Sequence, residues 1–256
     1  MIRWETRGLV GLATIDRPER RNALNAGLCD DLCARLEAST SLRAVVITGS
    51  GSAFCSGADL VTRFEGGDDT AQPAADTLRP AFEKLMNAVV AFPAPVIAAL
   101  NGPALGAGMQ LAVACDFRVA APTATFGIPA ARLGLVLSPA NIQRLALLVG
   151  QAAARELLMT GRTLDRDEAA AIGLVHRGAS DALAAALAWA AEITDLAPLT
   201  VAGHKRALNL VAGAEAIDEA AADEIRALEA AALPSADLQE GLAAFGEKRA
   251  PRFEGR

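Results

Sequence analysis

The segment Asn101–Phe117, with the sequence NGPALGAGMQLAVACDF, has the composition of an active-site loop that leads directly into a helix. Its three glycines leave the backbone open to another molecule, and the amide of Ala107 is expected in the first turn of the helix. Unpaired N–H groups and the helix dipole favour a negatively charged oxygen at such a position. The segment contains no acid or base before Asp116, so its chemistry is that of a site that holds an oxygen without moving a proton.

A second loop of the same kind follows the buried apolar run at 43–49. The segment Ser50–Leu60, SGSAFCSGADL, is again built of small residues, and it predicts an exposed N–H at Ala58. Two such amides that converge on one point form an oxyanion hole. The alternative is that both loops are glycine-rich turns that packing requires. Two loops, each after a buried strand, favour the functional interpretation.

Short strand-forming runs alternate with amphipathic helices in the first part of the chain, a pattern typical of the α/β class. We expect strands within 8–15, 43–49 and 94–102, and helices within 26–38 and 81–92. Beyond residue 151 the chain is rich in alanine, leucine and charged residues. Further helices are expected at 180–196, 200–213, 215–232 and 236–248. The acidic, glycine-containing segment Arg63–Asp76 has no periodicity and predicts a mobile surface loop.

Composition narrows the class of protein. The 256 residues, 52% of them apolar, are enough for a sizeable core, and 24 basic residues interleaved with 30 acidic ones argue against nucleic-acid binding. No secretion signal is visible, and the uncharged run Leu85–Cys115 is broken by prolines and glycines, so we expect a cytoplasmic protein without a membrane span. The four cysteines match no zinc spacing, and we expect reduced core residues and no metal site. They are Cys29, Cys33, Cys55 and Cys115.

Two long motifs, ITGSGSAFCSGADL at 47–60 and the segment 101–135, resemble the two signatures of the crotonase superfamily, the enoyl-CoA hydratase/isomerase group. DRPERRNALN at 16–25, the segment 148–177 and FGEKRAPRF at 245–253 are similar to its pattern as well. The resemblance implies a spiral core of ββα turns, placed at 1–195, and a helical trimerisation region, placed at 196–256. It further implies a homotrimer or homohexamer that binds acyl-CoA and needs no other cofactor.

The resemblance also implies roles for individual residues. By motif position, the amides of Ala58 and Ala107 hold the thioester oxygen, beside Gly106 of the second loop. Coenzyme A is placed near Arg20 and Arg21. Its remaining contacts are placed at Ser56, Gly57, Asp59 and Leu60, with Phe245 and Lys248 closing over it. Ser138 and Asn141 are interpreted as polar lining of the site.

Two departures from the family pattern bear on catalysis. Hydratases of this superfamily carry glutamates at the positions occupied here by Gln110 and Ala130. Those carboxylates orient a water molecule, deprotonate it and protonate the α-carbon of the substrate. Glutamine cannot exchange a proton near neutral pH, and alanine cannot hold the water. A similar loss of both glutamates occurs in some actinobacterial members of the family.

Other residues offer little to replace the glutamates. The chain has no tyrosine, and Asp116 is the only acid between Glu83 and Glu156. Asp116, beside a predicted strand, is expected to form structural hydrogen bonds. We expect structural or surface positions for the remaining candidates, which are His176, His204, Cys55 and Arg132. Only the carboxylates of the insert, Glu65, Asp68 and Asp69, stay open as a supply of acid or base.

Two hypotheses follow from these departures. The first is a protein that binds a fatty acyl-CoA through a backbone oxyanion hole, to sense, carry or present it, without normal hydratase activity. The second is an active enoyl-CoA hydratase or isomerase of fatty acid metabolism that uses a non-standard acid or base. They differ in whether a carboxylate lies within reach of the α-carbon of the bound thioester.

Overall fold

The computed structural model describes residues 1–59, 72–133, 135–212, 235–247, 249 and 251–256, together with positions 220, 223, 224 and 227. Its main sheet has the strand order β1-β2-β3-β4-β6-β9. Strand β1 is antiparallel to β2, and all the other neighbours are parallel. The strands are β1 (Ile2–Arg7), β2 (Val10–Ile15), β3 (Ala44–Gly49), β4 (Val96–Leu100), β6 (Phe117–Ala120) and β9 (Arg177–Gly178).

The apolar runs at the centre of this sheet are buried on both faces, as parallel strands require. Every residue of β2, β3 and β4 is buried, and Leu12 pairs with Val46, which pairs with Ile97. The strands predicted within 8–15, 43–49 and 94–102 are therefore confirmed. Strand β1 was not predicted, because its residues alternate between the core and solvent and carry charge on the exposed side.

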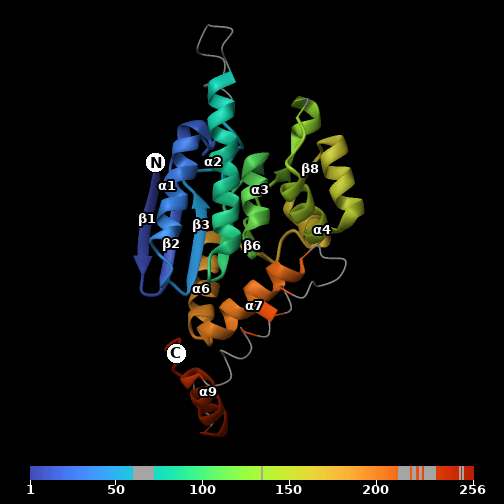
Figure 1. Ribbon diagram of the computed structural model, residues 1–256. Helices are drawn as coiled ribbons and strands as arrows, with labels where there is room; N and C mark the ends of the chain where they lie inside the picture. The colour runs from blue at the N-terminus through green and yellow to red at the C-terminus, as the bar shows by residue number, and fades with distance from the viewer. Residues whose placement is uncertain are drawn as a thin grey trace.

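Helices cover both faces of the sheet and make a three-layer arrangement (Figure 1). Helices α1 (Ala26–Glu37) and α2 (Gln72–Ala91) pack on one face against Val45 and Ile47, and α6 (Ala182–Thr194) packs on the other against Val46. The predicted apolar stripe of α1 is confirmed by its buried leucines. They are Leu28, Leu32 and Leu36.

Helix α2 begins at Gln72, nine residues before the predicted start at 81. Residues 72–76 are therefore helical, and the prediction of a loop over all of Arg63–Asp76 was wrong for this part. Pro73 lies in the first turn, where the missing N–H of proline costs nothing, and the alanines after it are good helix formers. The rest of the predicted loop, with Glu65, Asp68 and Asp69, lies outside the described residues.

A smaller unit follows the main sheet and carries the second glycine loop. Its three-stranded sheet has the order β5-β7-β8, with β5 parallel to β7 and β7 antiparallel to β8. The helix α4 is interrupted at Gly150 and is capped by Gly161, whose φ of 61° is left-handed. The elements of this unit are β5 (Ala104–Leu105), α3 (Ala107–Ala114), β7 (Phe126–Gly127), η3 (Pro129–Leu133), α4 (Pro139–Thr160), β8 (Thr163–Leu164) and α5 (Arg166–Ala171).

The C-terminal part is helical, with α7 (Pro198–Val211) beneath the sheet and α9 (Ala236–Glu247) farther from it (Figure 1). The helices predicted at 180–196, 200–213 and 236–248 are confirmed, whereas most of 215–232 lies outside the described residues. The boundary predicted after residue 195 falls between α6 and α7 and stays a prediction.

The last residues of the chain are fixed to α9 and to the core. The Asp237 carboxylate accepts hydrogen bonds from the N–H groups of Glu254 (2.6 Å) and Gly255 (2.8 Å). Arg43, directly before β3, donates from Nη2 to the carbonyl oxygen of Phe253 at 2.7 Å and from Nη1 to that of Thr194 at 3.1 Å. The C-terminal tail thus contacts a residue at the start of a central strand.

Within the described part of the chain, no single helix is long and apolar enough to cross a bilayer. Helices α6 and α7, which meet at 111°, reach that length and apolarity only when they are taken together. The same residues contain no cluster of metal-ligating side chains, and all four cysteines are free and buried.

Candidate active site

The amide of Ala58 is presented by a single parallel β-bridge between Leu24 and Ala58. The Leu24 N–H donates to the carbonyl oxygen of Gly57 and the Asp59 N–H donates to that of Leu24, both at 2.8 Å. Because successive trans peptides point to opposite sides of an extended chain, the Ala58 N–H points away from Leu24. Among the described residues it has no acceptor.

The amide of Ala107 begins helix α3, as predicted. Gly106 precedes the helix with φ of 53°, and its own N–H donates to the Gly127 carbonyl oxygen at 2.8 Å. No described residue accepts a hydrogen bond from the Ala107 N–H, which is one of the unpaired donors at a helix start. The positive end of the α3 dipole lies at the same place.

The two loops touch at these amides. The Leu105 N–H donates to the Cys55 carbonyl oxygen at 2.9 Å. A β-carbon on Gly57 would lie 3.1 Å from the Leu105 carbonyl oxygen and 3.7 Å from the Ala107 nitrogen, and the φ of Gly57 is 111°. The peptide groups that carry the Ala58 and Ala107 amides therefore lie next to one another. This geometry supports the predicted oxyanion hole, which stays a prediction.

Packing explains some of the glycines, as the alternative interpretation held. A β-carbon on Gly108 would lie 2.3 Å from the Cys55 carbonyl oxygen, so α3 needs a glycine there to reach the first loop. Gly57 and Gly106 differ, because both have positive φ and both border the unpaired amides. Gly108 is thus required for packing, whereas Gly57 and Gly106 present the unpaired amides.

A buried asparagine and an ion pair hold the first loop, and sequence reasoning did not single out either. Asn22 is fully buried, and its Nδ2 donates to the carbonyl oxygens of Ser50 (2.8 Å) and Ala53 (2.7 Å). Arg17 pairs with the Asp59 carboxylate at 2.9 Å, and that side chain is 5% exposed. The predicted contact of Asp59 with coenzyme A stays a prediction, and its carboxylate pairs with Arg17 within the loop.

Gln110 was predicted to stand where hydratases of the family have a glutamate, and both ends of its side-chain amide are engaged by the protein. Its Nε2 donates to the Gly106 carbonyl oxygen at 3.3 Å, and its Oε1 accepts from Asn141 Nδ2 at 2.8 Å. Asn141 Oδ1 in turn accepts from Arg144 Nη1 at 2.9 Å. No carboxylate is among these contacts.

A recess too narrow to admit a water molecule lies against Gln110. Arg144 is the charged member of its lining, which consists of Gln110, Val113, Ile128, Asn141, Arg144 and Leu145. Ala130, at the second glutamate position, is half-buried and follows Ile128 by two residues. Ser138, predicted to line the site, is the N-cap residue of α4 and makes no capping bond with its side chain.

The sequence pattern of one family matches nearly the whole chain. The profile of the enoyl-CoA hydratase/isomerase family covers residues 5–256. The chain belongs to this family. A relative named "Probable enoyl-CoA hydratase echA6", from Mycobacterium leprae, is 43% identical over 253 residues, which are 96% of each chain. The human "Enoyl-CoA hydratase domain-containing protein 2, mitochondrial" is 38% identical over 253 residues, with 94% of this chain and 84% of the human protein covered.

Solved structures of the family confirm the crotonase fold. The enoyl-CoA hydratase/carnithine racemase from Magnetospirillum magneticum superposes with a TM-score of 0.88 at 35% identity, over 100% of this chain and 96% of the other. An enoyl-CoA hydratase from Polaromonas sp. JS666 gives a TM-score of 0.89 at 31% identity, over 99% of both chains. The fold class predicted from the two glycine motifs is therefore correct.

In this member of the enoyl-CoA hydratase/isomerase family, the predicted coenzyme A contacts are only partly described. The Ser56 N–H donates to the Arg21 carbonyl oxygen at 3.0 Å, and Ser56 Oγ donates to that of Arg20 at 3.3 Å. Both arginines are exposed beside the first loop. The predicted contacts outside the described positions or side chains are Leu60, Phe245 and Lys248.

The remaining candidate residues lie in environments that do not favour acid–base or nucleophilic catalysis. Burial raises the pKa of the Cys55 thiol to about 12, so Cys55 is not a thiolate near neutral pH. The His176 ring lies 5.6 Å from that of Phe117 and 6.2 Å from that of Trp189, and desolvation lowers its pKa to about 4. Arg132 is exposed, as expected.

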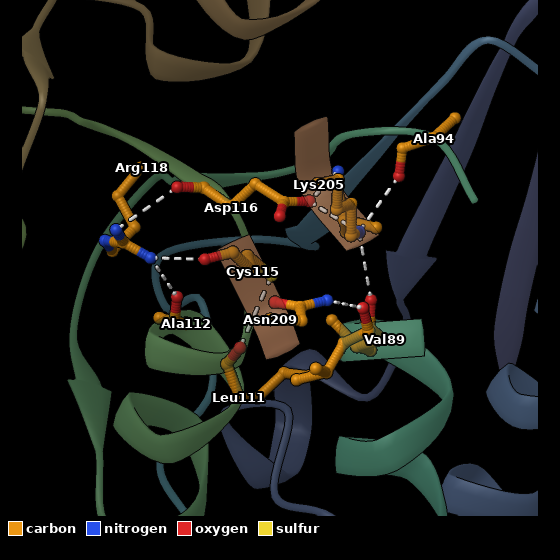
Figure 2. Close-up of polar contacts among 11 residues, drawn as sticks. Val89, Ala94, Leu111, Ala112, Cys115, Asp116, Arg118, Lys205 and Asn209 are labelled. Carbon is orange, nitrogen blue, oxygen red and sulfur yellow. Dashed lines mark hydrogen bonds and ion pairs between the residues drawn. The ribbon is translucent and has the colours of Figure 1, made fainter. Parts of the chain in front are cut away.

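Asp116 belongs to a charged cluster that fastens α7 to the core (Figure 2). Its Oδ2 accepts hydrogen bonds from the Val96 N–H and from Lys205 Nζ, both at 2.7 Å. Lys205 also donates to the carbonyl oxygens of Val89 (3.3 Å) and Ala94 (3.0 Å). The expected structural role of Asp116 is confirmed, but its partner Lys205, 89 residues away in sequence, was not foreseen.

Arg118 extends the same cluster on the other side of Asp116 (Figure 2). The residue is 2% exposed, and its guanidinium donates hydrogen bonds to backbone carbonyl oxygens, among them those of Leu174 (2.7 Å) and Ala112 (2.9 Å). Desolvation lowers the Arg118 pKa to about 10, which still leaves it charged at neutral pH.

Proposed function

We propose that the protein binds a fatty acyl-CoA thioester through the amides of Ala58 and Ala107 and does not hydrate enoyl-CoA at a normal rate. The observation that carries the proposal is the pair of unpaired, adjacent amides next to a glutamine whose side-chain amide is engaged by Gly106 and Asn141. The names of the relatives supply the class of ligand, a coenzyme A thioester.

The proposed chemistry is electrostatic stabilisation without proton transfer. Two N–H groups and the N-terminus of α3 stabilise negative charge on a thioester oxygen. Hydration also needs groups that exchange protons with water and with the α-carbon, and Gln110 and Ala130 cannot do so. The protein then acts as a cytoplasmic homotrimer or homohexamer that senses, carries or presents the acyl group.

An active hydratase or isomerase is the second candidate, and the names of the relatives favour it. Under this hypothesis an insert carboxylate replaces the missing pair, and the candidates are Glu65, Asp68 and Asp69. The two candidates share the binding site and differ only in turnover.

The proposal is tested by titrating the protein with acyl-CoAs of rising chain length. Calorimetry measures the binding, and turnover of the enoyl forms is recorded in parallel. We expect saturable binding that strengthens with chain length and exceeds that of free coenzyme A, with crotonoyl-CoA hydrated about 10²–10⁴-fold more slowly for each missing proton transfer than by a two-glutamate relative. Hydration at the rate of that relative would select the second candidate. Equal affinity for free coenzyme A and its thioesters would contradict the acyl site itself.

A further inference from the structure

We infer that Arg144, Asn141 and Gln110 form a charged hydrogen-bond relay that strengthens the Ala107 amide as a donor to the thioester oxygen. The inference rests on the proposed function, because it assumes a thioester oxygen at that amide. It assigns positioning roles to these three residues, because their side-chain hydrogen bonds reach the Gly106 carbonyl group and not the ligand itself.

The donors of the relay all point in one direction. Arg144 Nη1 donates to Asn141 Oδ1 at 2.9 Å, Asn141 Nδ2 donates to Gln110 Oε1 at 2.8 Å, and Gln110 Nε2 donates to the Gly106 carbonyl oxygen at 3.3 Å. That oxygen also accepts the Gln110 backbone N–H at 3.1 Å. Hydrogen bonds in such a chain polarise one another, so each acceptor group becomes a better donor at its other end.

The last acceptor of the relay is part of the peptide bond that carries the Ala107 N–H. A hydrogen bond to the carbonyl oxygen of a peptide draws electron density from its nitrogen, because resonance joins the two atoms. The bonds at the Gly106 oxygen therefore increase the positive charge on the Ala107 N–H. Gln110 thus serves the oxyanion amide, whereas a glutamate there would serve proton transfer.

Among the described residues, no carboxylate pairs with the charge at the start of the relay. Arg144 is half-buried, its Nη2 donates to Asn87 Oδ1 at 3.0 Å, and the described residues include no carboxylate within ion-pair distance of it. Desolvation lowers its pKa from the usual arginine value. Asn87 on α2, Asn141 and Arg144 on α4 and Gln110 on α3 hold the relay between three helices.

A relay of this kind favours ligands whose thioester oxygen gathers negative charge. Among acyl-CoAs, the class that does so most readily is the enolisable β-ketoacyl thioester, which loses an α-proton to the solvent buffer and spreads the electron pair over its oxygens. Such a ligand reports directly on the strength of the Ala107 amide, because a stronger donor lowers the pH at which the bound enolate forms.

The test is the apparent pKa for enolate formation of bound acetoacetyl-CoA, followed by the near-ultraviolet absorption of the enolate. Arg144→Gln should raise this pKa by about 0.3–1 unit, or about 2–10-fold in enol acidity, since a charge that acts through several groups does less than one in direct contact. Arg144→Lys keeps a charge and should shift it less. Gln110→Met, which removes the last link and leaves Arg144 in place, should raise it as well.

The matched control is Arg155→Gln, which removes an exposed arginine eleven residues further along α4, beyond its interruption at Gly150. Its apparent pKa should equal that of the unchanged protein. If Arg144→Gln shifts the enolate pKa no more than Arg155→Gln does, the relay is overturned. The relay is also overturned if Arg144→Gln shifts this pKa and Gln110→Met does not, because the charge would then act through space. Failure of acetoacetyl-CoA to bind the unchanged protein overturns the proposed function together with the relay, whereas binding with unshifted variants overturns the relay alone.

Discussion

Two polar clusters of this protein differ in whether they contain formal charges or backbone amides that are free to bind a ligand. The anchor of α7, formed by Asp116, Arg118 and Lys205, holds formal charges and satisfies them with one another or with backbone carbonyls. The site between the two glycine loops offers backbone amides and the carboxamides of Gln110 and Asn141. The chain places a partly buried acid where α7 docks, whereas the described contacts of Gln110 include no acid.

This difference leads us to propose that the fold and the acyl-CoA site can be kept without the proton-transfer groups of a hydratase. A buried ion pair is costly to break, because the remaining charge has no compensation. Preorganised amides carry no formal charge, and they become valuable only when a ligand brings a negative oxygen. Substitution of the two glutamates therefore leaves the fold and the amides intact, and the following experiments test that separation.

The largest change should come from returning charge to the site. The double substitution Gln110→Glu with Ala130→Glu should raise crotonoyl-CoA hydration by about 10²–10⁴-fold for each proton transfer that it restores. Asn141 Nδ2 can donate to a carboxylate oxygen as it now donates to Gln110 Oε1, so the new side chain has a partner. Steady-state kinetics of each single and the double variant measure the effect. Single variants as active as the double would show that these positions do not act as a pair.

Removing charge from the anchor should destabilise the fold without altering the site. Lys205→Met leaves Asp116 and two carbonyl groups without their buried donor, and we expect a loss of about 3 kcal/mol in the free energy of unfolding by urea. The control is Lys84→Met, which removes an exposed lysine paired with Glu37 and should change little. Similar losses in both variants would show that burial does not distinguish the Lys205 pair from a surface one.

A smaller effect is expected from deleting one amide of the site. Ala107→Pro removes an N–H that bonds to no described residue, at a helix position where proline is tolerated, so the melting transition should persist. Loss of one hydrogen bond to the thioester oxygen should weaken acyl-CoA binding by about 0.5–1.5 kcal/mol in calorimetry.

Lys248→Ala provides the contrast for that experiment. It should weaken acyl-CoA and free coenzyme A alike, because the family pattern places this residue at the nucleotide end of the ligand. Unchanged acyl-CoA affinity in a folded Ala107→Pro variant would mean that the second loop is only a turn.

The smallest effect is expected in the pH dependence of the free energy of unfolding, and it should come from His176, near the anchor of α7. Desolvation lowers the pKa of His176, next to Phe117, to about 4 from an unfolded value near 6.5. Between these values the unfolded state binds the extra proton, so stability decreases as the pH falls from about 6.5 to about 4.

The ring is partly exposed and solvent screens its charge, so the loss should not exceed about 1 kcal/mol. His176→Phe keeps an aromatic ring against Phe117 and Trp189 and should flatten this part of the pH profile of urea unfolding. An unchanged profile would assign the acid sensitivity to other groups.

Local sequence predicted most of the fold and the two unpaired backbone amides on which the proposed site depends. Apolar runs fixed the central strands, and the glycine loops located Ala58 and Ala107, because a turn that exposes an amide needs particular residues at particular positions. The start of α2 was missed, since the insert before it has no apolar periodicity and helical propensity alone decides.

Contacts between distant segments escaped prediction. Asn22 gave no signal of its distant partners, Ser50 and Ala53, because any exposed turn accepts an asparagine equally well. Lys205 lies 89 residues from Asp116, and a lysine in a helix ordinarily indicates a solvent-exposed face. The relay from Arg144 escaped for the same reason, since it depends on how α2, α3 and α4 pack together.

The hydrogen bond from Arg43 to the carbonyl oxygen of Phe253 implies an order of assembly during synthesis. The two residues are 210 positions apart, and chains emerge from the ribosome N-terminus first at about 5–20 residues per second. Strands β2 and β3, which are close in sequence, can therefore pair before Phe253 has been made. Arg43 Nη2 therefore cannot bond to Phe253 until that residue has been made, so the docking of the C-terminal tail follows the pairing of β2 with β3.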